Sequence, residues 1–161
     1  MKQLILIRHA KSSWRHNVID HKRPLSNRGF NDAQIISNHL SSSNLKVELV
    51  LSSDATRAKT TANIIVSNLG INQELFSLDH DLYDFSGENL IKTIKNCENE
   101  IGCLMVFGHN HAITAFVNSF GDKYIENVPT CGVVIIEFDI NNWKNINKGK
   151  TIKTLFPRDF K

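Results

Sequence analysis

The stretch LILIRHAKSSW, residues 4–14, contains an apolar run that ends abruptly in a cation and an imidazole. Leu4 to Ile7 are all apolar, which is typical of a strand that is buried on both faces of a sheet. Arg8 and His9 stand directly at the end of this expected strand. Either the strand simply surfaces into water there, or it holds these two side chains in a fixed position.

Similar apolar segments recur along the chain and alternate with segments of helical spacing. We expect further strands at residues 47–51, 75–78, 103–107 and 133–138, and helices near residues 26–40, 55–69, 86–97 and 111–119. The residues after 138 are polar and predict a tail on the surface. Strands that alternate with helices predict an α/β fold, a three-layer α/β/α sandwich with a mostly parallel central sheet and helices on both faces.

Local signals indicate the ends and faces of these helices. Ser26 and Ser86 are the expected N-caps, because a serine hydroxyl can accept a hydrogen bond from a free N–H of the first turn. Gly70 stands where a C-terminal cap belongs. In the first helix, Phe30 and Ala33 are apolar and stand three residues apart, so we expect both on the buried face.

Length and composition indicate one domain that spans residues 1–161. The formal net charge of +3 is too small, and the basic residues are too dispersed, to favour a nucleic-acid partner. No apolar run approaches the about 20 residues of a membrane span, and Arg8 interrupts the first apolar run too early for a signal peptide. We therefore expect a cytoplasmic protein in which the cysteines, Cys97, Cys103 and Cys131, are free thiols.

Two arginines and two histidines follow three of the expected strands. The first strand ends in Arg8 and His9, the second leads through Ser52 into Arg57, and the third is followed by His109. Ligands of an open α/β sheet bind outside the carboxyl ends of its strands, so we expect these side chains to lie at one edge. Their convergence favours a functional site over an ordinary strand end.

Two guanidinium groups and two imidazoles suit a doubly charged tetrahedral anion. Arginine stays charged and offers a fork of donors that matches phosphate oxygens, and helix N-termini after the strands would add backbone N–H groups. A neutral histidine can attack phosphorus. Neighbouring arginines should lower the pKa of a histidine by like-charge repulsion and keep its attacking nitrogen unprotonated near neutral pH.

Several motifs, in this order, resemble those of the histidine phosphatase superfamily, which includes the cofactor-dependent phosphoglycerate mutases. They are RHAKS at 8–12, RPLSNRG at 23–29, SSDATRAKTTA at 52–62, GHNH at 108–111 and NVPTCGVVIIEFD at 127–139. The short length, RHAKSSW and PTCGVV make the chain most similar to the small phosphohistidine phosphatases. The resemblance implies a phosphoglycerate mutase-like fold without a large lid insertion, because residues 71–102 have room for little more than one strand and one helix.

The resemblance implies a role for each of the four converging residues. His9 would be the nucleophile that becomes transiently phosphorylated. Arg8, Arg57 and His109 would hold the phosphoryl oxygens and neutralise the charge that builds on them. No metal ion and no cofactor is expected, because cationic side chains take the place that Mg²⁺ has in kinases.

The proton donor is harder to assign. The resemblance places it in DHDLYDFSGENL, residues 79–90, where Asp84 is the first choice and Glu88 and Asp81 are the alternatives. All three carboxylates are equally well explained as solvated loop residues.

Residues beside the two histidine motifs complete the expected site. Ser12 and Asn110 are expected to bind the phosphate. Lys11 would add positive field, and Trp14 either walls the site or packs elsewhere. His111 stands where small phosphohistidine phosphatases tend to have proline, and it is either a surface residue or an extra donor. The histidine pair of this motif lacks a nearby carboxylate, which argues against a metal site.

We therefore expect a metal-independent phosphatase that forms a phosphohistidine intermediate and dephosphorylates phosphohistidine on a protein. The uncertain donor favours this substrate, because imidazolium has a pKa of about 6.5 whereas a departing alkoxide needs protonation. The alternatives are a phosphomonoesterase or mutase with a small phosphorylated substrate, and an inactive phosphate- or phosphoprotein-binding module. Inorganic phosphate would be the product, and neither nucleic acid nor a membrane is an expected partner.

Overall fold

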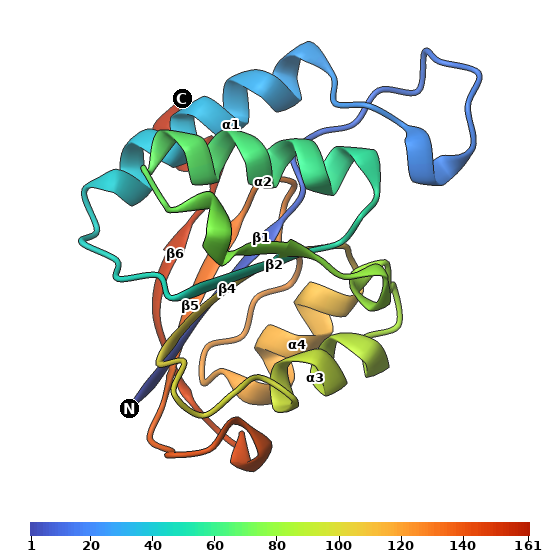
Figure 1. The fold of residues 1–161 in the computed structure, drawn as a ribbon. Coiled ribbons are helices and arrows are strands. Elements are labelled where there is room, and N and C mark those ends of the chain that lie inside the picture. Colours follow the sequence, from blue (N-terminus) through green and yellow to red (C-terminus); the bar gives the residue numbers. More distant parts are fainter.

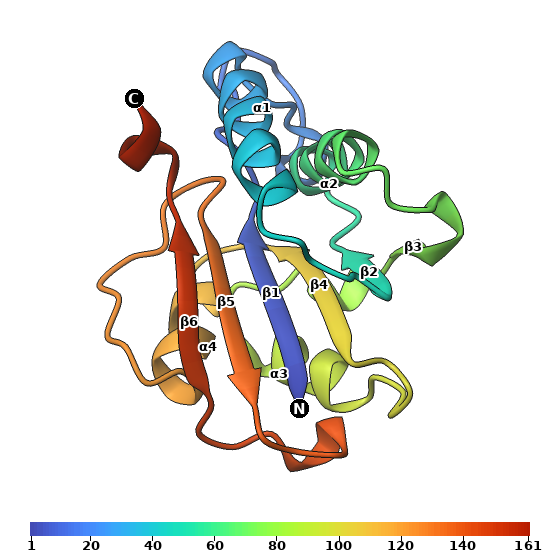
Figure 2. The ribbon, with the colours of Figure 1, turned by 90° about the vertical axis from the view of Figure 1, so that its left-hand side faces the viewer.

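The apolar run at the start of the chain forms a central strand of a six-stranded sheet. A computed structural model describes residues 1–161, and its strand order is β3-β2-β4-β1-β5-β6 (Figures 1 and 2). The strands are β1 (Lys2–Arg8), β2 (Leu49–Ser52), β3 (Phe76–Leu78), β4 (Cys103–Gly108), β5 (Val133–Phe138) and β6 (Lys150–Leu155). The pairs among β1, β2, β3 and β4 are parallel, whereas β5 runs antiparallel to both of its neighbours.

Four α-helices cover the two faces of the sheet. They are α1 (Asn27–Ser41), α2 (Thr56–Asn68), α3 (Glu88–Lys95) and α4 (Ala112–Phe120). In Figure 1, α1 and α2 lie above the sheet and α3 and α4 lie below it. The predicted three-layer sandwich is confirmed, and no large lid is inserted between β3 and β4. None of the helices combines the length and the apolar character that crossing a bilayer requires.

Successive residues of β1 supply the cores on opposite faces. Leu4 and Leu6 belong to a cluster of 19 buried residues that includes side chains of α3 and α4. Ile5 and Ile7 belong to a cluster of 18 buried residues that includes side chains of α1 and α2. This burial on both faces explains why the run shows no alternation of apolar and polar residues. Because β1 is packed on both faces, the position of its last residue, Arg8, is fixed.

The prediction of a surface tail after residue 138 is wrong in two respects, because Trp143 is fully buried and part of the segment joins the sheet. Residues Lys150–Leu155 form β6, which pairs with β5 at the edge of the sheet. The sequence KTIKTL is mainly polar, and Leu155 is its one buried residue. A partly solvated edge strand needs no continuous apolar run, and charged residues on it oppose pairing with another chain.

The local signals in α1 and α2 predict the helix ends better than the buried face. The hydroxyl of Ser26 accepts a hydrogen bond from the N–H of Gly29 at 3.2 Å, and Gly70 follows α2 in a left-handed conformation with a φ of 68°, as predicted. The expectation that Phe30 is buried is wrong, because its side chain is 46% exposed. Gly29 is buried instead, and a Cβ added there would stand 2.2 Å from a backbone oxygen of the loop after β1.

Candidate active site

The carboxyl ends of β1, β2 and β4 meet, and backbone hydrogen bonds continue past the strands. The N–H of His9 donates to the carbonyl of Gly108 at 3.1 Å, and the N–H of Ser53 donates to the carbonyl of Phe107 at 3.0 Å. These bonds hold the first residues after the strands in fixed register. His9, Ser53 and His109 therefore leave the sheet at the same edge.

The His9 ring is held in one tautomer. Its Nδ1 lies 2.7 Å from the carbonyl oxygen of Ala10, which can only accept a hydrogen bond, so Nδ1 carries the proton. The lone pair is therefore on Nε2, which accepts a hydrogen bond from Nε of Arg57 at 3.3 Å. Burial, together with the positive charges of Arg57 and Arg8, lowers the pKa of His9 to about 3. His9 thus presents an unprotonated nitrogen to Arg57 at neutral pH.

Arg57 lies in the first turn of α2 and is almost fully buried. Its Nη1 donates to the backbone carbonyl of Asp20 at 2.7 Å, and its Nη2 donates to the Asp20 carboxylate at 3.0 Å. Asp20 lies in the short 3-10 helix η1 (Asp20–Lys22), and its carboxylate also accepts from Arg23 at 3.1 Å and from the hydroxyl of Tyr83. Burial alone would raise the pKa of Asp20, but the hydrogen bonds from Tyr83 and Arg57 hold it well below its usual range.

His109 and Arg8 each have a buried nitrogen without a hydrogen-bond partner in the protein. Nε2 of His109 lies 2.8 Å from the hydroxyl of Ser53, whereas its Nδ1 has no partner. Arg8 donates from Nη1 to the carbonyl of Val128 at 2.9 Å, whereas its Nε has no partner. The ring centroids of His9 and His109 are 5.1 Å apart. Burial lowers the pKa of His109 to about 2, so this ring is neutral as well.

One cavity of about 240 Å³ is lined by Arg8, His9, Arg57 and His109. The structure thus brings together the two arginines and two histidines that follow three different strands. Nε of Arg8 is a buried donor without a partner in the protein, and it suits a ligand with several acceptor oxygens, because such a ligand satisfies it. The two guanidinium groups and two imidazoles in this cavity suit a tetrahedral oxyanion.

A family model supports this interpretation of the site. The model of the histidine phosphatase superfamily (branch 1) matches residues 4–85, just over half of the chain, and this range contains both His9 and Arg57. The chain belongs to the histidine phosphatase superfamily.

The chain is also similar to an uncharacterised relative in sequence and to solved structures in fold. The chain is 29% identical over 154 residues to an uncharacterised chloroplast protein of Arabidopsis thaliana, and the match covers 89% of this chain and 69% of that one. It shares its fold with a proposed phosphohistidine phosphatase, SixA, from Agrobacterium tumefaciens at a TM-score of 0.80 and 24% identity, over 96% of this chain and 97% of that one. A protein histidine phosphatase SixA bound to tungstate gives a TM-score of 0.84 at 18% identity, over 99% of both chains.

Arg23 contacts other residues that line this cavity. Its Nη1 donates to the hydroxyl oxygen of Ser12 at 2.6 Å, and its guanidinium lies over the Trp14 ring at 3.6 Å from the centroid. The Ser12 hydroxyl therefore keeps its own proton to donate. Ser12, Trp14 and Lys11 all line the cavity, and Trp14 is 75% exposed. Trp14 thus both walls the site and packs on an arginine.

Asn110 also lines the cavity, but both ends of its amide are engaged. Its Oδ1 accepts from the N–H and the hydroxyl of Thr114 at 3.1 and 2.7 Å, and its Nδ2 donates to Asn127 at 2.7 Å. Asn110 therefore fixes the loop after β4 and has one N–H left for a ligand. His111 is exposed at the N-cap of α4 and does not line the cavity, so it is a surface residue.

Asp84 does not line the cavity that contains the two histidines. The Asp84 carboxylate accepts from the backbone N–H groups of Gly87, Asn89 and Leu90, each at 3.1 Å, and so caps α3. Ser86, the predicted cap of this helix, instead donates to the same carboxylate at 3.1 Å. Partial burial would raise the pKa of Asp84, but the backbone hydrogen bonds lower it below its usual range. An ionised helix cap outside the cavity is a poor proton donor, so the expected role of Asp84 has no structural support.

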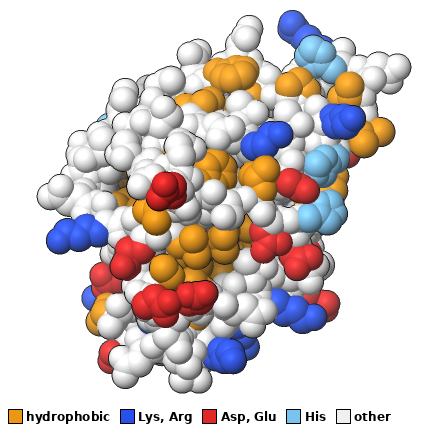
Figure 3. Space-filling view, in the orientation of Figure 1, with side chains coloured by type: hydrophobic (Ala, Val, Ile, Leu, Met, Phe, Trp, Pro, Cys, Tyr) orange, Lys and Arg blue, Asp and Glu red, His pale blue; other side chains and the backbone are white.

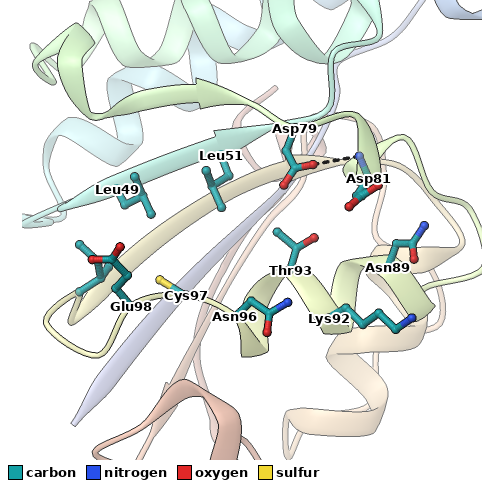
Figure 4. A pocket seen from close by; sticks show the side chains of 11 residues that line it. Leu49, Leu51, Asp79, Asp81, Asn89, Lys92, Thr93, Asn96, Cys97 and Glu98 are labelled. Carbon is teal, nitrogen blue, oxygen red and sulfur yellow. Dashed lines mark hydrogen bonds between the residues drawn. The ribbon is translucent and has the colours of Figure 1, made fainter.

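The two alternative donors are no better placed. Asp81 lines a separate groove of about 480 Å³ between β2 and α3, where Figure 3 shows an apolar strip flanked by acidic side chains and Figure 4 shows the groove from close by. This groove contains no histidine or arginine and shares no lining residue with the histidine cavity. Glu88 is exposed in the first turn of α3 and lines neither. None of the three candidate acids therefore lines the cavity that contains His9.

Four residues that matter to the site were not predicted from the sequence: Asp20, Arg23, Tyr83 and Thr61. The hydroxyl of Thr61 accepts from the N–H of Ala10 at 2.9 Å and donates to the carbonyl of Arg57 at 2.8 Å. Thr61 stands one helical turn after Arg57, and that spacing is a signal that could have indicated it. Asp20 and Tyr83 reach the site only through tertiary contacts.

Proposed function

We propose that this chain is a phosphatase that dephosphorylates phosphohistidine on proteins, with His9 as its nucleophile and without a metal ion. The observation that carries the proposal is the environment of Nε2 of His9. This nitrogen has its lone pair free, lies in a buried ring, and is contacted by the guanidinium of Arg57. Fixed positive charge beside a neutral nucleophile suits attack on a phosphoryl dianion.

In the first step, Nε2 of His9 forms a bond to phosphorus while the bond from phosphorus to the substrate nitrogen breaks. The electron pair of the broken bond leaves with the substrate imidazole, whose other nitrogen carries the proton. The Nδ1 proton of His9 stays on its hydrogen bond to the Ala10 carbonyl, which stabilises the positive charge that develops on the ring.

In the second step, water attacks the phosphorylated His9. A phosphorus–oxygen bond forms, the bond to Nε2 breaks, and the nitrogen regains its lone pair as the water proton passes to solvent. Arg8, Arg57 and His109 hold the phosphoryl oxygens through both steps. The Nε–H of Arg57, which donates to Nε2 in the free protein, turns to a phosphoryl oxygen once the substrate is bound.

The acidic residues of the region favour a leaving imidazole over a leaving alkoxide. Asp20, the one acidic residue of the cavity, is held ionised by its arginine and tyrosine partners, and Asp84 caps a helix. Neither is suited to donate a proton. Imidazolium has a pKa of about 6.5, so a phosphorus–nitrogen bond can break without a strong acid. The names of the SixA proteins with the same fold refer to phosphohistidine or to protein histidine, and one of them binds a tetrahedral oxyanion, which supports the same substrate class.

A peptide that carries radiolabelled phosphohistidine tests the proposal. We expect the label to pass to the protein as an acid-labile adduct and then to appear as inorganic phosphate. The adduct should be absent in His9→Ala, and a circular dichroism spectrum should show that this variant is folded. A chelator should leave the rate unchanged.

Other outcomes would assign a different function. Faster hydrolysis of sugar phosphates or p-nitrophenyl phosphate than of the peptide would indicate a small-molecule phosphomonoesterase. Tungstate binding without label or turnover would indicate a silent binding module. Loss of activity in chelator would indicate a metal-dependent hydrolase.

A further inference from the structure

A cluster of two histidines and one aspartate lies next to the phosphate site but does not line its cavity. His21 comes from η1, Asp54 from the turn between β2 and α2, and His80 from the 3-10 helix η3 (His80–Leu82). Nε2 of His21 and Nδ1 of His80 lie 2.8 and 3.0 Å, respectively, from Oδ1 of Asp54. The three ligand atoms all lie within 4.8 Å of one another.

Tyr83 holds the two histidine rings in position. Its ring packs edge-on against His21 with 4.9 Å between centroids, and it lies 5.9 Å from the ring of His80. Its hydroxyl donates to the carboxylate of Asp20, the residue before His21. Figure 3 shows histidine side chains gathered beside acidic groups at the right-hand edge of the molecule. Side chains from three separate segments are thus brought to one point on an accessible surface.

The chemistry of this cluster matches a transition-metal site better than an alkaline-earth site. Zinc binds histidine nitrogens and aspartate oxygens at about 2.0–2.2 Å, usually in a tetrahedron, which puts neighbouring ligand atoms about 3.3 Å apart. The two nitrogen–oxygen distances to Oδ1 of Asp54, 2.8 and 3.0 Å, would have to increase by only a few tenths of an ångström. Magnesium and calcium prefer oxygen ligands, and two of the three ligand atoms here are nitrogens.

We propose that His21, Asp54 and His80 bind a divalent metal ion of the zinc class, with the remaining coordination position taken by water or a small exogenous ligand. The ion fastens η1 to the turn before α2 and to η3. The ion lies outside the phosphate cavity and takes no part in breaking the phosphorus–nitrogen bond, so this site and the proposed reaction are independent.

Isothermal titration calorimetry with zinc chloride tests the site, using the full chain after dialysis against a chelator. We expect one ion per chain. His80→Gln and His21→Gln should each weaken zinc binding by at least about tenfold, since even outer-shell changes at metal sites cost about 10–100-fold. His111→Gln removes an exposed histidine outside the cluster and is the matched control, with zinc affinity equal to that of the wild type.

The thermal melting temperature gives a second readout that does not depend on activity. Zinc should raise it in the wild type and in His111→Gln, but not in His80→Gln, because a ligand stabilises the fold only where it binds the native state. The proposal is overturned if the wild type binds no zinc or if His80→Gln binds it as tightly as the wild type. Equal affinity for magnesium would overturn the assignment to the zinc class.

Discussion

The carboxylate of Asp20 lies 3.0 Å from Nη2 of Arg57, in a cavity where it is the one acidic residue. A negative charge beside an anion site opposes the binding of phosphate. It is therefore better explained as a positioning group. The bonds from both terminal nitrogens of Arg57 to Asp20 hold the guanidinium in the orientation in which Nε donates to His9.

Replacing Asp20 should lower the catalytic rate without weakening anion binding. In Asp20→Ala the guanidinium of Arg57 loses its carboxylate partner, so we expect kcat on a phosphohistidine peptide to fall by about tenfold or more. Tungstate should bind at least as tightly as to the wild type, because a repulsive charge is gone. Asp20→Asn keeps an acceptor oxygen and should lose less activity. Weaker tungstate binding in both variants would contradict a positioning role, and steady-state kinetics with tungstate inhibition measures both quantities.

Arg57→Lys tests whether charge alone is enough at this position. Lysine keeps the positive charge but cannot reproduce the planar donors that reach Nε2 of His9 and both acceptors of Asp20. Loss of one preorganised donor typically costs about 10²–10³ in rate, and we expect phosphoenzyme formation to slow by that factor. Single-turnover measurements with labelled peptide give the rate directly. A rate within a few-fold of the wild type would mean that the fork geometry is not needed.

The sequence predicts the parts of this site that are local. Leu4–Ile7 is apolar because β1 is buried on both faces, and the residues that follow a buried parallel strand must emerge at its carboxyl end. Arg8, His9 and His109 could therefore be placed without a structure. The fold class follows from the same alternation of strands and helices.

Other features depend on contacts that the sequence does not reveal. Asp20 stands in a polar segment that resembles any surface loop, and only its bonds to Arg57 and Tyr83 give it a role. β6 is polar because it is an edge strand. For Asp84, the sequence suggested a role that the structure does not support. A carboxylate that caps a helix and one that donates a proton cannot be distinguished in the sequence. Its hydrogen bonds decide between the two.

Asp84→Ala should reduce stability and leave the chemistry intact. The change removes the acceptor of the first N–H groups of α3, and loss of such a cap typically costs about 0.5–2 kcal/mol in the free energy of unfolding. We expect a change within this range in urea denaturation and an unchanged kcat on the phosphohistidine peptide. Asp84→Asn keeps one acceptor oxygen, so its free energy of unfolding should lie between those of the wild type and of Asp84→Ala. A large loss of kcat with unchanged stability would restore Asp84 as the proton donor.

The buried histidines should make the protein less stable in acid. Burial lowers the pKa of His9 to about 3 and that of His109 to about 2, against about 6.5 in an unfolded chain. Between about pH 6.5 and pH 3, the unfolded state therefore binds protons that the folded state does not, so the free energy of unfolding falls as the pH falls. Each histidine contributes up to about 1.4 kcal/mol per pH unit in this range. Urea unfolding at a series of pH values from neutral to mildly acidic measures the slope.

The double variant His9→Gln, His109→Asn isolates the contribution of these two residues to the pH dependence of stability. It carries every other histidine of the chain, so any difference in slope between it and the wild type belongs to His9 and His109. We expect the variant to lose less stability per pH unit than the wild type below pH 6.5, whatever its stability at neutral pH. Equal slopes would mean that the two rings titrate in the folded protein as they do in the unfolded chain. In that case His9 would be partly protonated near neutral pH, and the lone pair that the proposed reaction requires would be available only at higher pH.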